Sequence, residues 1–104
     1  MHFQPVIIRM ASIIDKSFSL GQLVATPGAI EVLQESSQTP LEFLGRHKKC
    51  DWGEVCSEDW QLNDEAVENG ERLLSAYHTL NGIKIWIITE ADRSSTCILL
   101  PDEY

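Results

Sequence analysis

Apolar residues change their spacing twice along the chain, and these changes predict strands, then helices, then strands again. Up to "FSLGQLVA", short apolar and β-branched runs are interrupted by Ser12, Ser17 and Gly21, which is typical of one or two strands. From Thr26 to Gly70 the apolar positions and capping residues favour helices. After Gly70, short apolar runs separated by turn residues predict an antiparallel meander.

The first two predicted helices share a start signal, a threonine followed by a proline. Thr26 and Pro27 open a helix of about nine residues through "GAIEVLQES". Thr39 and Pro40 open the second helix in "QTPLEFLGRH", where Glu42 completes a capping box with Thr39. The inward side of this helix is expected to carry Leu41, Phe43 and Leu44. A third helix is expected from Ser57 to a left-handed stop at Gly70, on the surface, because its apolar stripe is thin: Leu62, Ala66 and Val67.

The Asn81-Gly82 pair is the strongest hairpin signal, because both residues tolerate positive φ. As a two-residue loop, it sets Leu80 opposite Ile83 and Tyr77 opposite Trp86. One face of the hairpin then carries Leu74, Ala76, His78, Leu80, Ile83, Ile85 and Ile87, and the other carries Leu73, Ser75, Tyr77, Trp86 and Ile88. Both faces are largely apolar, so helices should cover one, and the N-terminal segment or a partner the other.

These elements predict an α+β fold of two layers with three short helices packed mainly on one face of an antiparallel sheet. The sheet combines a three-stranded C-terminal meander, ending with "STCILLP" before the stop at Pro101, with one or two N-terminal strands. The composition, 43% hydrophobic and 23% charged over 104 residues, is ordinary for a globular domain. We therefore expect a single domain over residues 1–104, of which residues 1–18 are an N-terminal extension or strand.

The sequence gives no signal for a membrane span or a disulfide framework. The stretch "VIIRMASII" is broken by Arg9, lacks a cleavage site and is too short to cross a bilayer. Three cysteines, Cys50, Cys56 and Cys97, cannot all pair within one chain, which suits a reducing compartment. The expectation is a cytoplasmic protein with reduced thiols.

Negative charge is concentrated in one segment of the chain. The formal net charge is −8, with 16 acidic and 8 basic side chains. The stretch from residue 51 to residue 71 contains no lysine or arginine, and its acids are Asp51, Glu54, Glu58, Asp59, Asp64, Glu65, Glu68 and Glu71. Such a field attracts basic surfaces and repels phosphate backbones. These eight residues are the predicted partner-binding set, and direct binding of nucleic acid is disfavoured, except at the small basic cluster "RHKK" that precedes them.

Two other groups of residues are candidates for chemistry. Glu90, Asp92 and Arg93 lie between two apolar strands, where they form either a site, with Asp51 or His47, or a turn in which Asp92 accepts backbone N–H groups. The second group, His47, Cys50 and Cys56, has metal-ligand chemistry, with His78 and Cys97 as distant additions. Five residues separate the two cysteines, wider than the usual spacing of a structural zinc site. No metal or cofactor is therefore predicted, and the turn Asp51-Trp52-Gly53 is expected to anchor its loop through the indole.

The blocks "GQLVATPGAI", "PLEFLGRH", "DWG", "RLLSAY" and "IWIITEADRSSTCILLPDEY" resemble, in this order, a family of small bacterial proteins encoded on plasmids, phages and other mobile elements. The resemblance covers roughly Leu20 to Tyr104 and names no activity. Cys50 departs from it, since the family pattern usually has glycine before "DWG", which argues against a family-wide metal role for this cysteine.

The acidic segment and this resemblance together predict a small accessory protein of mobile elements that acts by protein–protein contact. Its concrete form is an inhibitor of a nucleic-acid-handling host defence system, of the anti-restriction or anti-CRISPR type, that occupies a basic groove by charge mimicry. One alternative is a small enzyme or ligand-binding domain that uses Glu90, Asp92 and Arg93. The other is a homodimer that buries the second sheet face.

Overall fold

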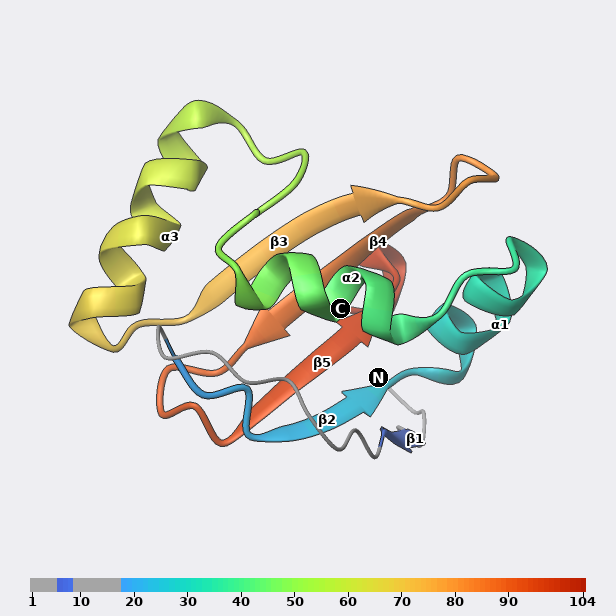
Figure 1. Cartoon of the computed structure of the whole chain (residues 1–104), viewed down its shortest axis with the longest axis horizontal. Coiled ribbons are helices and arrows are strands. Elements are labelled where there is room, and N and C mark those ends of the chain that lie inside the picture. The colour runs from blue at the N-terminus through green and yellow to red at the C-terminus, as the bar shows by residue number, and fades with distance from the viewer. Residues whose placement is uncertain (1–5, 9–17) are drawn as a thin grey trace.

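The computed structural model describes residues 6–8 and 18–104, and over these residues it shows an α+β fold built on one five-stranded sheet. The strand order is β1-β2-β5-β4-β3 (Figure 1). Helices α1 and α2 lie over one face of this sheet, while α3 stands beside the β3 edge (Figure 1). The predicted α+β architecture, with its C-terminal meander, N-terminal strands and three helices, is confirmed.

The strands are β1 Val6–Ile8, β2 Gln22–Ala25, β3 Leu73–His78, β4 Lys84–Thr89 and β5 Ser95–Leu99. Strands β3, β4 and β5 form the antiparallel meander, and β1 pairs antiparallel with β2. Strand β2 pairs parallel with β5, and the elements between them supply the long crossover that a parallel pair needs. The sheet is therefore mixed. The prediction for residues 1–18 falls mostly outside the described residues, among which 6–8 form β1.

The helices are α1 Pro27–Glu35, α2 Pro40–Lys48, α3 Ser57–Asn69 and a short 3₁₀-helix, η1 Pro101–Glu103. Thr26 caps α1 as predicted, because its hydroxyl accepts a hydrogen bond from the Ala29 N–H at 3.1 Å. The predicted capping box of α2 is wrong, since Thr39 makes no side-chain cap bond and Glu42 accepts from Gln38 Nε2 at 2.7 Å instead. In the part of the chain that the structure describes, no helix has the length and apolarity to cross a membrane.

The inner side of α2 differs from the predicted one. Leu41 is 53% exposed, whereas Phe43, Leu44 and His47 are fully buried. Positions 43, 44 and 47 follow helical spacing toward the sheet, and position 41 falls outside this stripe. Together with Leu33 of α1, the inner apolar residues of α2 form the main core against strand residues Tyr77, Ile85, Ile87 and Ile98.

The hairpin between β3 and β4 has a register one residue away from the predicted one. Tyr77 pairs with Ile85 and His78 with Lys84, because the loop has three residues rather than two. Thr79 closes this loop: its N–H donates to the Ile83 carbonyl at 2.9 Å, and its hydroxyl accepts from the Ile83 N–H at 3.1 Å. The third loop residue, Gly82, has a φ of +80°, which fits a type I turn followed by a bulge.

The shifted register changes which residues of β3 and β4 share a face. Leu73, Ser75 and Tyr77 of β3 lie on the buried face with Ile85, Ile87 and Thr89 of β4. Trp86 pairs with Ala76 instead of Tyr77, and the predicted Tyr77–Trp86 pair is therefore wrong. On its own face, Trp86 contacts Tyr104 edge to face, with ring centroids 5.9 Å apart.

Candidate binding face

Helix α3 carries most of the predicted partner-binding acids, and three anchors hold it at the β3 edge. The Asn63 amide donates to the Leu74 carbonyl at 2.8 Å, and its oxygen accepts from the Leu74 N–H at 3.2 Å. The Trp52 indole, fully buried, donates to Asp64 Oδ1 at 2.9 Å. At the other end, Arg93 Nη2 donates to the Ala66 carbonyl at 2.9 Å, an oxygen that also accepts from the Glu71 N–H at 3.0 Å. The helix is therefore fixed relative to the sheet.

The Asn63 anchor gives a direct stability prediction. In Asn63→Ala, the N–H and C=O groups of Leu74 lose their partner at the sheet edge, which should lower the free energy of unfolding by about 2 kcal/mol. Urea unfolding measures this change, and hydrogen exchange should show faster exchange of the Leu74 amide. Gln61→Ala is the matched control on the exposed side of α3 and should change stability by less than about 0.5 kcal/mol. Equal stability of the two variants would contradict the role of Asn63.

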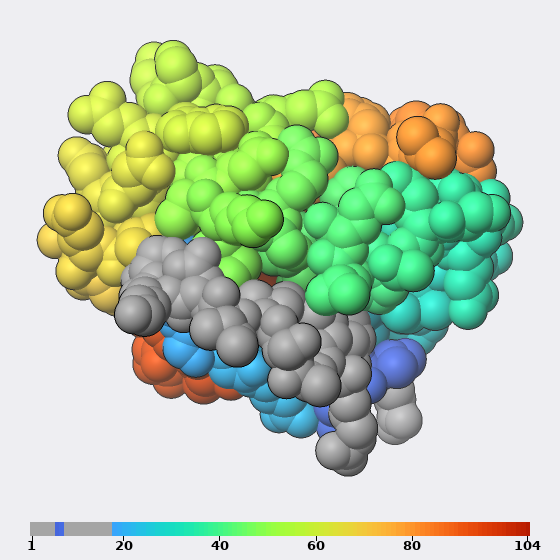
Figure 2. Space-filling view, viewed as in Figure 1, coloured from blue at the N-terminus to red at the C-terminus, as the bar shows by residue number. Residues whose placement is uncertain are grey.

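The outward side of α3 is an acidic face, defined here as Glu58, Glu65 and Glu68. These residues are spaced seven and three apart, so their side chains emerge on one side of the helix. All three are exposed, and in residues 6–8 and 18–104 no ion pair involves them. Figure 2 shows α3 along one rim of the molecule, with this outer side open to solvent. The face is thus negatively charged and accessible.

Three of the five predicted acids outside the acidic face have a close polar partner. Asp51 pairs with Arg46 at 2.8 Å, and the hydrogen bond from that guanidinium lowers the pKa of Asp51. Glu54 accepts from His78 Nδ1 at 2.7 Å. Asp64 accepts from the Trp52 indole at 2.9 Å. The other two members, Asp59 in α3 and Glu71 beyond the helix end, remain exposed.

The corner between β4 and β5 brings Glu90, Asp92 and Arg93 into a turn. Asp92 accepts from the Ser94 N–H at 3.0 Å, and hydrogen bonds from Ser94 lower the pKa of its carboxyl. Arg93, with a φ of +61°, donates to carbonyls of Ala66, Glu71 and Glu90. Glu90 Oε2 lies 3.8 Å from Arg72 Nε. Each of the three side chains has its own structural partner, which matches the turn interpretation rather than a shared pocket.

His47, a candidate for both catalysis and metal binding, is fully buried inside a chain of hydrogen bonds. Thr96 donates to the Leu20 carbonyl at 2.7 Å, so its oxygen accepts from Thr89, which in turn accepts from His47 Nε2 at 2.9 Å. This order places a proton on Nε2, and burial lowers the pKa of His47 to about 3, so the imidazole is neutral at pH 7. Nδ1 of the neutral ring then accepts from the hydroxyl of Ser75. The sequence signal for this network was the presence of Ser75, Thr89 and Thr96 within apolar strands.

Within the described residues, the three cysteines are not part of a metal site. In residues 6–8 and 18–104, no group of three or more histidine, cysteine or acidic side chains could hold a metal ion. Cys50 has a φ of +64°, a conformation that glycine adopts readily. Burial raises the pKa of the Cys97 thiol to about 11, so this thiol stays protonated at neutral pH.

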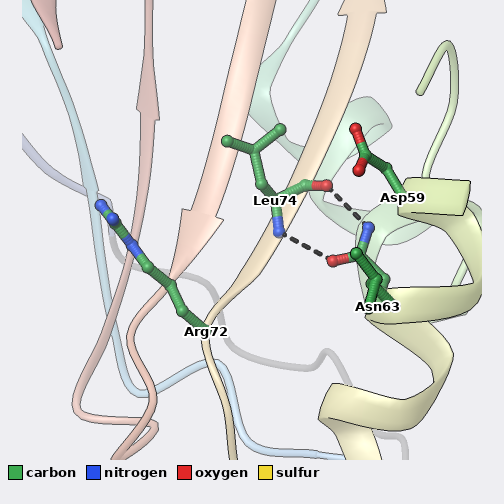
Figure 3. A pocket seen from close by; sticks show the side chains of 5 residues that line it. Asp59, Asn63, Arg72 and Leu74 are labelled. Carbon is green, nitrogen blue, oxygen red and sulfur yellow. Dashed lines mark hydrogen bonds between the residues drawn. The ribbon is translucent and has the colours of Figure 1, made fainter. Parts of the chain in front are cut away.

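A cleft of about 280 Å³ lies between α3 and β3 (Figure 3). Its lining consists of Asp59, Leu62, Asn63, Arg72 and Leu74. The sequence placed Leu62 on the inner stripe of α3, yet this residue is 60% exposed, and Asn63 takes the inward position. The predictions missed this cleft, because it depends on how the helix docks on the strand.

Comparison of the chain with protein-family models, with curated proteins and with solved structures gives no match.

Proposed function

We propose that the protein is a small accessory protein that acts by protein–protein contact, with the acidic face of α3 binding a basic surface of its partner. One observation carries this proposal: Glu58, Glu65 and Glu68 project from an anchored helix into solvent, with no ion pair among the described residues. A fixed array of like charges speeds encounter with an oppositely charged surface and disfavours wrong partners. The negative charge also argues against nucleic acid as the direct ligand.

Within this proposal, the partner is a host protein complex that handles nucleic acid, such as a restriction or CRISPR system. Such complexes carry basic grooves for phosphate backbones, and an acidic helix of fixed geometry can occupy a groove of this kind. The resemblance to proteins of plasmids and phages supports a partner of this kind, since mobile elements meet these host systems when they enter a cell. The protein would then act in the cytoplasm as an inhibitor that blocks the groove.

Affinity capture from cell extract tests the proposal with two charge-matched variants. The test variant combines Glu58→Gln, Glu65→Gln and Glu68→Gln, and the control combines Glu31→Gln, Glu35→Gln and Glu42→Gln, which are also exposed but lie in α1 and α2. Both variants lose three negative charges. We expect the wild type and the control to retain the same basic protein, released by salt, and the test variant to bind it about tenfold more weakly. Equal retention by all three proteins would contradict the proposal.

A further inference from the structure

The cleft beside the acidic face has an apolar wall and a carboxylate next to it. Leu62 is 60% exposed and Leu74 is half-buried, and both line the cleft, Leu62 from α3 and Leu74 from β3. Asp59 lies at the α3 side of the cleft and is exposed. In the described part of the chain, Asp59 forms no ion pair. An exposed leucine and a carboxylate without a cationic partner thus line one opening.

The floor of the cleft is fixed before any ligand binds. Both polar groups of the Asn63 amide bond to the Leu74 main chain, so they tie α3 to β3 and fix the spacing of the two walls. Arg72 extends away from α3, where it donates to the Tyr104 hydroxyl at 2.6 Å and lies 3.8 Å from Glu90. The guanidinium therefore does not neutralise Asp59. The cleft stays open, apolar on its walls and negative at its α3 side.

The size of the cleft and its position on α3 indicate the kind of ligand. A volume of about 280 Å³ lies just below the range of about 300 to 1,000 Å³ that is usual for small-molecule sites, and it suits one or two side chains of a protein. Leu62 follows Glu58 by four positions and precedes Glu65 by three, so the cleft borders the acidic face directly. A ligand that enters the cleft therefore meets negative charge on the helix at the same time.

We infer that the cleft between α3 and β3 is the anchor site for an apolar side chain of the partner, so that the partner presents a basic amphipathic segment to this surface. The inference rests on the proposed function and extends it. Charge complementarity selects the occupant: lysine or arginine residues of the segment face Asp59, Glu58 and Glu65, while one large apolar residue packs against Leu62 and Leu74. Apolar burial adds affinity that charge alone does not supply, since aliphatic area removed from water is favourable at any salt concentration.

Two fluorescent probe peptides test this inference. One is an amphipathic peptide of leucine and lysine, and the other has the same length and charge with every leucine replaced by glutamine. In anisotropy titrations, we expect the leucine peptide to bind about tenfold more tightly than the glutamine peptide. Leu62→Ser should remove most of this difference, whereas Leu41→Ser, a change of a leucine of similar exposure in α2, should leave it intact. Methyl chemical shifts of Leu62 and Leu74 should move only with the leucine peptide.

The titrations separate failure of this inference from failure of the proposed function. Equal affinities for the two peptides, or equal losses in Leu62→Ser and Leu41→Ser, would overturn the anchor site. If both peptides still lost affinity in the variant with Glu58→Gln, Glu65→Gln and Glu68→Gln, the acidic face would remain the binding face. If that triple variant bound both peptides as tightly as the wild type does, the proposed function would fail as well.

Discussion

The free energy of unfolding should fall by about 1.4 kcal/mol for each pH unit between about pH 6 and pH 4 because of one residue, His47. Its pKa is about 3 in the folded protein, against an ordinary value of 6.5. Between these two values the unfolded chain binds a proton that the folded chain excludes, so a lower pH favours unfolding. Above about pH 7.5 His47 is neutral in both states, and its contribution no longer depends on pH. The loss should reach about 2 kcal/mol at pH 5.

The cause of this low pKa is the closed environment of the imidazole. Burial is the largest contribution, and the nearby cations Arg93 and Lys48 act in the same direction. The rings of Phe18 and Trp52 pack edge-on against His47, with centroids 5.6 and 5.4 Å away. Protonation at Nδ1 would also turn the acceptor of the Ser75 hydrogen bond into a donor.

Urea unfolding from pH 7 to pH 4.5 measures the predicted slope, and NMR of the imidazole nitrogens measures the protonation state directly. His47→Gln should flatten the slope. If His47→Gln does not fold, the NMR titration of the wild type still measures the pKa of His47 in the folded protein and so tests the prediction. An imidazole of His47 that titrates near pH 6.5 in the folded protein would refute the prediction.

Gly53→Ala should lower the free energy of unfolding by about 3 kcal/mol. Gly53 has a φ of +74°, which costs a residue with a Cβ about 1 to 2 kcal/mol. A Cβ at this position would also overlap the Ala76 carbonyl oxygen and stand 2.6 Å from the ring of Tyr77. Both neighbours belong to β3, and Gly53 bridges to Ala76 there, so neither can move without disturbing the sheet edge.

Two other glycines separate the causes of this effect. Gly70→Ala places a Cβ at a φ of +69° in open space, so it should show the backbone cost alone, about 1 to 2 kcal/mol. Gly45→Ala lies within α2, also in open space, and should raise stability by about 0.5 to 1 kcal/mol. Thermal or urea unfolding gives all three values. A cost for Gly53→Ala no larger than that for Gly70→Ala would show that the predicted overlap is relieved without loss.

The sequence could predict the elements of this fold because their signals are local. The Thr26-Pro27 start of α1, the stop of α3 at Gly70 and the break after β5 at Pro101 each depend on neighbours in the chain. The predicted register of the hairpin was wrong because the loop has three residues, closed by the Thr79 side chain. The Asn81-Gly82 pair alone does not reveal this loop length. A slip of one residue moves the side chains of one strand to the other face relative to those of its partner strand.

The sequence predicted the charge of the candidate site but not its shape. The acids of the acidic face lie within one predicted helix, at positions 58, 65 and 68. Their helical spacing places them on the same side, so the sequence predicts that they are exposed together. The His47 network joins residues 28 and 42 positions apart, and the cleft depends on the Asn63 bonds to Leu74. No pattern within one segment specifies such contacts, because they arise only when separate elements pack together.

The most direct test of the acidic face is the salt dependence of partner binding by the two triple variants. Association constants are measured from about 0.1 M to about 1 M NaCl, over which the Debye length falls from about 10 Å to about 3 Å. We expect a steep decline for the wild type and for the variant changed at Glu31, Glu35 and Glu42, and a shallow one for the variant changed at Glu58, Glu65 and Glu68. Parallel declines for all three proteins would show that the partner is bound elsewhere.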